Sequence, residues 1–220
     1  MTQIRRQIGI PHIAELFLAV LGLVAIAPIL LACAILIKLG SRGPVFFRQK
    51  RVGLNGNEFV LLKLRTMSVS NSGSLVTAAG DSRVTSIGRL LRVAKIDELP
   101  ELWNIVRGEM SFVGPRPEVP QYVDLADPIW QEILTHRPGI TDPVTLRLRN
   151  EEQLLAQVVD KETFYREVVQ PYKLRGYLYF IRNKSWKTDI RIIGRTLLAI
   201  AKPHTVAPPT MDEMQLSFVD

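Results

Sequence analysis

The sequence has little of several residue types on which enzymes commonly depend. It contains one cysteine, Cys33, and three histidines, His12, His136 and His204, which lie far apart in the 220-residue chain. A single cysteine forms no intrachain disulfide, and these positions match neither a zinc-site spacing nor a catalytic histidine cluster. A glycine-rich phosphate-binding fingerprint is also missing. Any phosphate binding must therefore come from side chains and helix ends.

Acidic residues are outnumbered by basic ones. The 28 Lys and Arg against 21 Asp and Glu give a formal charge of +7, and the isoelectric point is near 9.8. This balance favours partners that carry phosphate: nucleic acid, anionic lipid or a nucleotide-sugar. The length allows one modest core, which indicates a single catalytic unit with a membrane element.

Charge is nearly absent from the first long segment. The 25 residues from Ile13 to Ile37 carry one formal charge, Glu15, and would form about 37 Å of helix, enough to reach across a bilayer. The apolar run is too long for a signal peptide and is followed by Lys38 and Arg42 instead of a cleavage pattern. It is therefore predicted to be a membrane helix.

Basic residues flank this helix at both ends, and Pro28 lies near its middle. Because basic flanks stay on the cytoplasmic side, a helix that enters the bilayer and turns back would translocate neither end. Proline removes one backbone donor and leaves the carbonyl of Val24 without its helical partner, which permits a bend there. From composition alone, a re-entrant helix and a spanning helix with a mild kink are both open. The flanking basic residues are Arg5, Arg6, Lys38, Arg42, Arg48, Lys50 and Arg51.

After the membrane segment the patterns alternate between strands and helices. Residues 45–51 and 58–67 are predicted to form a β-hairpin, with Lys63 and Arg65 on one face. Residues 68–81 are predicted to be a mobile loop, and 84–93 an amphipathic helix that lies either at lipid headgroups or on the surface of a soluble core. Further helices are expected over 119–136, 151–159, 162–182 and 187–202, with a loosely ordered tail from Pro203.

Two adjacent carboxylates, Asp97 and Glu98, stand at the start of a further helical pattern that ends near Gly108. The plain interpretation is a capping aspartate followed by a first-turn acid that the helix dipole favours. Their neighbourhood points further, because several cations lie close in sequence and Arg116 stands between two prolines. Carboxylates among cations near a helix start are typical of a site for a divalent metal and a phosphate.

Four motifs together resemble one family. Residues 95–104 read Lys-Ile-Asp-Glu-Leu-Pro-Glu-Leu-Trp-Asn, residues 114–117 Gly-Pro-Arg-Pro, residues 43–49 Gly-Pro-Val-Phe-Phe-Arg-Gln and residues 62–67 Leu-Lys-Leu-Arg-Thr-Met. This set resembles the bacterial sugar transferases, the monotopic polyprenyl-phosphate phosphoglycosyl transferases. The resemblance runs from about residue 5 to residue 202 and is strong through Pro117.

The expected architecture is α+β and mostly helical. A re-entrant membrane helix (1–40), bent at Pro28, would precede a cytoplasmic catalytic domain (41–202) with a small β-hairpin and amphipathic interfacial helices, and the tail would cover 203–220. The family breaks its helix at a Ser-Pro pair, whereas this chain has Ala27-Pro28. The expected location is the bacterial inner membrane, with the catalytic domain facing the cytoplasm.

The resemblance implies transfer of a sugar-1-phosphate from a UDP-sugar to undecaprenyl or another polyprenyl phosphate, with release of UMP, as the first step of exopolysaccharide or glycoconjugate assembly. The reaction would pass through a phosphosugar ester on an aspartate and would need Mg²⁺, which neutralises the repulsion between phosphates. The implied partners are the polyprenyl phosphate, the UDP-sugar and inner-membrane lipid, without nucleic acid; no oligomeric state is implied.

The resemblance also assigns individual residues. Asp97 matches the nucleophile and Glu98 its partner, and both would hold the metal. Arg116 matches an arginine that holds a phosphate, and its planar fork suits two oxygens. The phosphate-binding set would comprise Arg116, Lys63, Arg65 and Arg92, and Asp189 matches a late acidic residue of the active site.

The chain departs from the family after Thr141. Many members continue with Gly-Trp-Ala-Gln-Val and an Asn-Gly pair, but residues 142–152 here read Asp-Pro-Val-Thr-Leu-Arg-Leu-Arg-Asn-Glu-Glu. Arg147 and Arg149 alternate as on a strand face and could contact phosphate or the nucleotide. The role of the divergent segment 142–160 and the identity of the sugar stay open at this point.

Two other hypotheses compete with the enzyme. In a non-catalytic membrane-surface scaffold, basic helices would bind anionic lipid and the acidic pair would only cap a helix, so Asp97→Asn would leave every biochemical property near normal. A membrane-anchored nucleic-acid-binding module would fit the basic balance, but no helix-turn-helix, zinc or RNA-recognition signature supports it.

Overall fold

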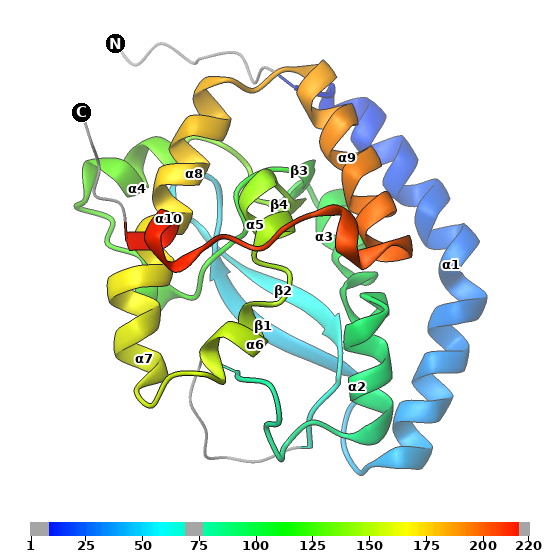
Figure 1. Ribbon diagram of the computed structural model, residues 1–220. Helices are drawn as coiled ribbons and strands as arrows, with labels where there is room; N and C mark the ends of the chain where they lie inside the picture. Colours follow the sequence, from blue (N-terminus) through cyan, green and yellow to red (C-terminus); the bar gives the residue numbers. More distant parts are fainter. Residues whose placement is uncertain (1–8, 69–76, 216–220) are drawn as a thin grey trace.

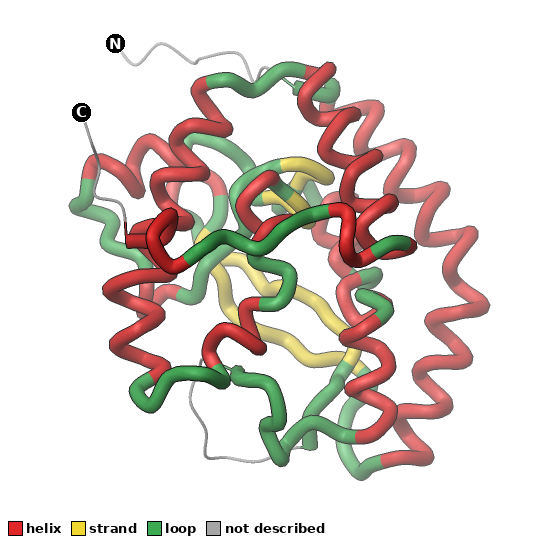
Figure 2. Tube along the Cα trace, viewed as in Figure 1, coloured by secondary structure: helices red, strands yellow, loops and turns green. Residues whose placement is uncertain are grey.

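The structure is a computed structural model, and it describes residues 9–68 and 77–215. Short strands lie in the middle of the molecule and helices surround them (Figures 1 and 2). The predicted α+β class with mostly helical content is confirmed. In chain order the described elements are α1 His12–Gly40, β1 Phe46–Val52, η1 Leu54–Gly56, β2 Glu58–Leu64, α2 Ser86–Val93, η2 Ile96–Glu98, α3 Glu101–Val106, β3 Ser111–Val113, η3 Pro120–Tyr122, α4 Pro128–Ile133, β4 Gly139–Thr141, α5 Pro143–Arg147, α6 Glu151–Leu155, α7 Lys161–Phe164, the π-helical turn η4 Tyr165–Val169, α8 Gln170–Arg182, α9 Trp186–Ala201, η5 Pro203–Thr205 and α10 Met211–Gln215.

The predicted hairpin is confirmed as β1 and β2, which pair antiparallel from Phe46 opposite Leu64 to Val52 opposite Glu58. The connection turns through Asn55 and Gly56, both with positive φ, a conformation that asparagine and glycine tolerate best. A second sheet, which the sequence did not predict, consists of β3 and β4 in parallel.

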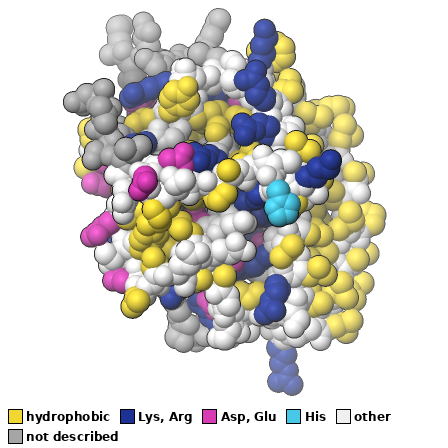
Figure 3. All heavy atoms as spheres, in the orientation of Figure 1, with side chains coloured by type: hydrophobic (Ala, Val, Ile, Leu, Met, Phe, Trp, Pro, Cys, Tyr) yellow, Lys and Arg dark blue, Asp and Glu magenta, His cyan; other side chains and the backbone are white. Residues whose placement is uncertain are grey.

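Helix α1 has 29 residues and continues through Pro28 to Gly40. It is long and apolar enough to cross a membrane, and it follows a curved path along one side of the molecule (Figure 1). The predicted break at Pro28 is not present in this helix. Its exposed side chains are mostly apolar, including Phe17, Val24 and Leu31, and Figure 3 shows hydrophobic side chains gathered along this edge.

Both ends of α1 are bonded to the rest of the protein. Near its start, a Glu15 carboxylate oxygen accepts a hydrogen bond from the backbone N–H of Phe112 at 3.0 Å. At its end, the guanidinium of Arg65 donates to the carbonyls of Ser41 at 2.8 Å and Arg42 at 2.9 Å. Arg65 thus supplies donors where a helix leaves carbonyls unpaired.

The predicted amphipathic helix 84–93 is confirmed as α2. Thr85 caps it by accepting from the N–H of Gly88 at 2.9 Å, and Leu91 is buried whereas Leu90 and Val93 are exposed. Gly88 is required for packing, because a Cβ there would lie 1.9 Å from the carbonyl oxygen of Thr66. The backbone of Thr66 therefore lies directly against α2.

The prediction that Asp97 caps the next helix is wrong. Asp97 lies inside η2, and α3 begins only at Glu101, without a side-chain cap. Lys95 adopts a left-handed conformation with φ 56°, which turns the chain between α2 and η2. The two carboxylates therefore sit on a short 3₁₀ turn between two helices.

The C-terminal half forms the main hydrophobic core between α4, α5, η4, α8 and α9. The helix expected over 119–136 is wrong in length, because only η3 and α4 form and Asp127 caps α4. The helix expected over 162–182 is confirmed, because α7, the π-helical turn η4 and α8 follow one another without a break from Lys161 to Arg182. The helix expected over 187–202 is confirmed as α9, with a capping box from Ser185 and Thr188. The strand-like alternation of Arg147 and Arg149 is also wrong, because α5 is helical.

The tail predicted to be loosely ordered is packed as far as residue 215. Val206 and Met214 are buried, Arg147 pairs with Glu213 at 2.8 Å, and Arg175 donates to the carbonyl of Met214 at 2.8 Å. Residues 216–220 lie outside the described part, as does most of the loop predicted over 68–81. The sparse apolar pattern after Pro203 concealed two anchoring side chains.

Arg65→Met should destabilise the protein, because the carbonyls of Ser41 and Arg42, which follow α1, would lose the donors of a buried guanidinium. We expect the free energy of unfolding to fall by about 2–4 kcal/mol, measured by thermal or urea unfolding in detergent. Arg48→Met, at an exposed position of the same hairpin, is the matched control and should change stability by less than about 0.5 kcal/mol. Equal losses in both variants would contradict this role of Arg65.

Candidate active site

Three acidic side chains from η2 and α3 meet two cations from other elements. Lys63 comes from β2 and Arg116 from the loop after β3. One oxygen of Glu98, Oε1, accepts from Nζ of Lys63 at 3.1 Å and from Nη2 of Arg116 at 2.5 Å. Segments more than fifty residues apart in sequence therefore meet at one carboxylate.

Glu101 is a member of this site that the sequence interpretation missed. Its side chain is 1% exposed, and Oε1 lies 3.3 Å from Nζ of Lys63 and 3.9 Å from Nη2 of Arg116. Neither oxygen has hydrogen-bond geometry with any partner in the described chain. The sequence contained the signal for it: Glu98 and Glu101 are three residues apart, and residues three apart on a helical segment face the same side.

Asp97 and Glu98 are neighbours in opposite electrostatic settings. Burial raises the pKa of Asp97, and the negative charge of Glu98 raises it further. Burial also opposes the charge of Glu98, but Arg116 and Lys63 outweigh it and hold the pKa of Glu98 well below its usual range. Glu98 is therefore an ion-paired carboxylate, whereas Asp97 keeps an oxygen, Oδ1, that is buried and without a hydrogen-bond partner among the residues described.

The position of Arg116 is fixed by a hydrogen bond from its own side chain and by a hydrogen bond to the carbonyl of the next residue. Its Nη1 donates to the carbonyl of Ile140 at 3.3 Å, and Arg51 donates to the carbonyl of Pro117 at 2.9 Å. Arg51 also lies 3.8 Å from Glu118, whose carboxylate accepts from the hydroxyl of Tyr165 at 2.5 Å. The loop that carries Arg116 is thus attached to both β1 and the main core.

Two other arginines predicted to bind phosphate are committed elsewhere. Arg65 is 5% exposed and bonds to the end of α1, so the prediction of phosphate binding is not supported by its position. Arg92 donates to Oγ1 of Thr66 at 2.9 Å and to Glu152 at 2.5 Å. Burial and Glu98 raise the pKa of Asp97, and the positive charge of Arg92 offsets a small part of this rise. Arg92 therefore lies at the edge of the site.

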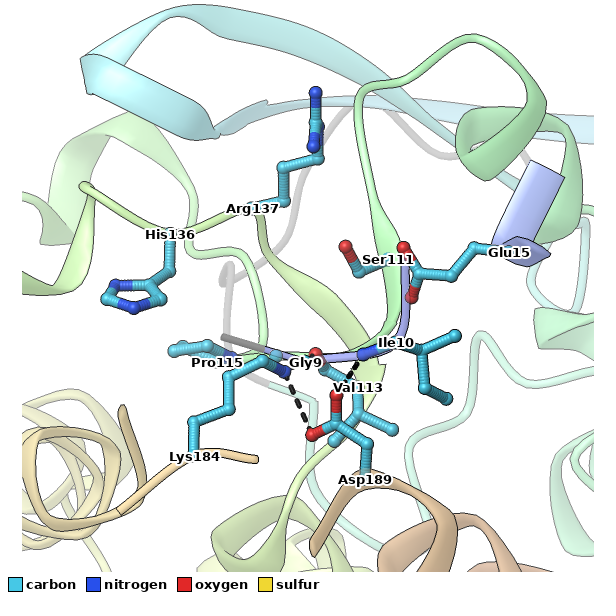
Figure 4. Close-up of a pocket in the computed structure, with 11 residues that line it drawn as sticks. Gly9, Ile10, Glu15, Ser111, Val113, Pro115, His136, Arg137, Lys184 and Asp189 are labelled. Atoms are coloured by element: carbon cyan, nitrogen blue, oxygen red, sulfur yellow. Dashed lines mark hydrogen bonds and ion pairs between the residues drawn. The ribbon is translucent and has the colours of Figure 1, made fainter. Parts of the chain in front are cut away.

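Asp189 lies in a different polar pocket, at the junction of α1 and α9 (Figure 4). Its carboxylate accepts from the backbone N–H of Ile10 at 3.1 Å and from Nζ of Lys184 at 3.0 Å. Lys184 also donates to the carbonyl of Val113 at 2.6 Å. The structure therefore does not bring Asp189 into bonding contact with the acidic pair, and gives it a role in attaching the segment before α1.

Arg149, from the divergent segment, has a guanidinium nitrogen, Nη1, that is buried and lacks a hydrogen-bond partner within residues 9–68 and 77–215. Its neighbour Arg147 is bonded to the C-terminal tail through Glu213. Arg149 therefore has a buried donor that no residue of the described part of the chain binds. An unpaired buried donor is costly unless something binds it.

The residues present fit a magnesium ion at the acidic pair. Within the described residues no three His, Cys, Asp or Glu side chains converge into a complete metal cage. Magnesium is, however, commonly bound by one or two carboxylates together with substrate phosphates and water. Asp97, with its unpaired buried Oδ1, and the adjacent Glu98 are the residues that would hold it.

Comparison with known proteins places this arrangement in a family. The family model of the bacterial sugar transferases matches residues 6–203, so the chain belongs to this family, as its four motifs predicted. A UDP-glucose:undecaprenyl-phosphate glucose-1-phosphate transferase of Caulobacter vibrioides is 48% identical over 126 residues, which are 55% of this chain and 47% of that protein.

Two further relatives cover more of the chain. A UDP-N-acetylgalactosamine-undecaprenyl-phosphate N-acetylgalactosaminephosphotransferase of Aeromonas hydrophila is 35% identical over 84% of this chain and 42% of its own length. The exopolysaccharide production protein ExoY of Sinorhizobium fredii is 30% identical over 84% of this chain and 83% of its own length. The chain thus spans less than half of the first two relatives and most of the third.

Glu98→Gln should destabilise the protein, because Lys63 and Arg116 would lose the charge they share. We expect a loss of roughly 2 kcal/mol at pH 7. Since the pKa of Glu98 is lowered by folding, its contribution is present above the usual glutamate pKa of about 4.3 and is lost as pH falls through the folded value. The difference between the two proteins should therefore close in acid.

Urea unfolding at pH 7 and at a series of lower pH values down to about pH 2, below which the folded carboxylate also becomes protonated, would measure this difference. Glu58→Gln is the matched control, because Glu58 forms an exposed ion pair with Lys50 at 2.9 Å and such pairs contribute about 0–1 kcal/mol. A loss for Glu98→Gln no larger than for Glu58→Gln would show that the buried carboxylate is not the shared counter-ion.

Proposed function

We propose that this protein transfers a sugar-1-phosphate from a UDP-sugar to undecaprenyl or another polyprenyl phosphate and releases UMP, in the assembly of an exopolysaccharide or glycoconjugate. The observation that carries the proposal is the carboxylate of Asp97, whose oxygen Oδ1 is buried without a hydrogen-bond partner among the described residues, next to Glu98, which binds two cations. The functions named for the relatives agree with this chemistry, and the shared family supports the same reaction class.

In the first step an oxygen of Asp97 attacks the phosphorus that carries the sugar. The bond from this phosphorus to the bridging oxygen breaks, UMP leaves with that electron pair, and the sugar phosphate is esterified to Asp97. In the second step an oxygen of the polyprenyl phosphate attacks the same phosphorus. The carboxylate leaves, the polyprenyl diphosphate sugar forms, and Asp97 is free again.

The cations of the site match the charge of this substrate. Lys63 and Arg116 are bonded to Glu98, the residue next to Asp97. They can bind the non-bridging oxygens of the transferred phosphate, with Arg116 able to use two donors at once. Arg149 offers its buried unpaired donor to the nucleotide half of the same molecule. A Mg²⁺ ion at Asp97 and Glu98 would neutralise charge on the diphosphate.

The raised pKa of Asp97 has a kinetic consequence. Only the ionised carboxylate can attack, so activity should fall in acid at a higher pH than for an ordinary aspartate. Glu98 stays ionised under the same conditions because Arg116 and Lys63 lower its pKa. Two adjacent carboxyl groups thus have different protonation ranges, which is typical of paired acids at an active site.

The membrane helix supports a one-sided attachment. Its start bonds through Glu15 and its end through Arg65 to the same folded unit. A straight span would place those two ends on opposite sides of the bilayer, which the contacts at both ends oppose. We propose that α1 lies in the cytoplasmic leaflet of the inner membrane without crossing to the other side, with both of its ends and the catalytic part in the cytoplasm.

Asp97→Asn should reduce UMP release from a UDP-sugar by at least about 1,000-fold, because the amide cannot form the ester. Purified protein in detergent would be incubated with undecaprenyl phosphate and UDP-glucose or UDP-N-acetylgalactosamine, and UMP would be measured. Asp212→Asn, at an exposed acid of α10, is the control and should keep normal activity. A normal rate for Asp97→Asn would show that Asp97 is not the nucleophile, and no UMP release from the unchanged protein would favour the non-catalytic scaffold.

The covalent step has its own test. Without the lipid phosphate, donor labelled with ³²P at the sugar-linked phosphorus should leave label on the protein, and mass spectrometry should find it on Asp97. Chase with undecaprenyl phosphate should remove the label into lipid. Label at another residue, or UMP release that strictly requires both substrates together, would contradict the two-step reaction.

Thiol labelling can decide the topology of α1. In a Cys33→Ala background, single cysteines at exposed positions on either side of the helix, Pro11→Cys and Arg42→Cys, would be treated with a membrane-impermeant thiol reagent. If the helix does not cross the bilayer, both should be protected in intact cells and labelled after lysis. A spanning helix would leave one of the two labelled in intact cells.

A further inference from the structure

Helix α3 contacts strand β2 through an apolar face and one buried amide. Phe59 and Leu61 of β2 pack with Leu102 and Ile105 of α3 in one hydrophobic cluster. Such contacts are not directional, so on their own they fix the distance between strand and helix better than the position of one along the other. The amide of Asn104, 1% exposed, supplies the directional contact.

Asn104 bonds to the backbone of β2 at two points. Its Nδ2 donates to the carbonyl of Val60 at 2.7 Å, and its Oδ1 accepts from the N–H of Leu62 at 3.1 Å. In β2 these two groups point to the same edge, the one not paired with β1, so the carboxamide occupies the place that a neighbouring strand's peptide group would take. Glu109 accepts a third bond from Nδ2 at 2.7 Å, which fixes the orientation of the amide.

The residue that follows this bonded edge is Lys63. Its ammonium reaches Glu98 at 3.1 Å and Glu101 at 3.3 Å. Glu101 and Asn104 are three residues apart on α3, so the same side of the helix holds the strand and receives the lysine. A slide of β2 along α3 would keep most apolar contacts but would move Nζ away from both carboxylates.

We propose that Asn104 is a positioning residue, which places Lys63 for phosphate binding by fixing β2 against α3. The proposal rests on the proposed transferase function only for its effect on catalysis. The placement of Lys63 itself can be measured without any substrate. A residue that acts through another should have little effect once that other residue has been removed.

A double-mutant cycle tests the effect on catalysis. UMP release would be measured with undecaprenyl phosphate and the better of UDP-glucose and UDP-N-acetylgalactosamine as donor. Asn104→Ala should lower kcat/KM by about 10- to 100-fold, as expected for a misplaced binding group. In a Lys63→Met background the same substitution should lower it by less than about threefold. Equal fold-losses in the two backgrounds would overturn the proposal and make Asn104 a general stabilising residue.

A substrate-free measurement keeps the two proposals distinguishable. The rate at which acetic anhydride acetylates Lys63 would be followed by peptide mass spectrometry in the full chain. Asn104→Ala should raise this rate several-fold, because the amine leaves its ion pairs. Gln170→Met, which removes a remote side-chain hydrogen bond to the carbonyl of Tyr122, is the matched control for lost stability and should leave the rate unchanged.

A milder variant covers the case in which Asn104→Ala does not fold. Asn104→Ser keeps a neutral polar side chain, adds no charge beside Glu109, and should give smaller changes in the same direction in both measurements. An unchanged acetylation rate in a folded Asn104 variant would overturn the proposal. Absence of UMP release from wild-type protein with every UDP-sugar would instead overturn the proposed function, and the acetylation result would still decide the role of Asn104.

Discussion

The carboxylate of Glu98, shared by Lys63 and Arg116, is the interaction on which the site depends. Two cations brought together without it would repel each other, and a buried carboxylate without them would be costly to ionise. The surrounding structure holds each cation in a separate way: β2 is bonded by Asn104 of α3, and the loop of Arg116 is bonded by Arg51. The site is therefore a preformed charge cluster, in which buried oxygens of Asp97 and Glu101 have no hydrogen-bond partner among the described residues.

Some of the basic residues are placed to bind a ligand, whereas others stabilise the fold. Arg65 donates to the carbonyl of Ser41 just after α1, and Lys184 donates to the carbonyl of Val113 in the pocket near the start of α1. Arg51 donates to the carbonyl of Pro117 in the loop that carries Arg116. The N–H groups of these cations donate to carbonyls and carboxylates of the protein itself. The net charge of +7 therefore overstates the number of basic residues that could bind phosphate.

Helix α1 packs against the elements that carry the candidate active site. Ala19 packs in the cluster that contains Leu102 and Ile105 of α3, and Cys33 and Ile37 pack with Leu64 of β2 and Leu91 of α2. The elements that carry Lys63, Asp97 and Glu98 are therefore built directly against α1. If the proposed function holds, this arrangement would bring a water-soluble donor and a lipid-bound acceptor to one place.

The sequence by itself determined the features that are local: the apolar length of α1, the hairpin, the helices α2 and α9, and the family motifs that single out Asp97, Glu98, Lys63 and Arg116. Periodicity and motif spacing report such features because they depend on neighbouring residues. Only the tertiary structure decided which cations reach the acids, that Arg65 and Asp189 hold the ends of α1, that Glu101 joins the site, and that the tail packs. These outcomes depend on contacts between residues far apart in the chain, where burial and competing partners, not residue type, determine what each charged group bonds to.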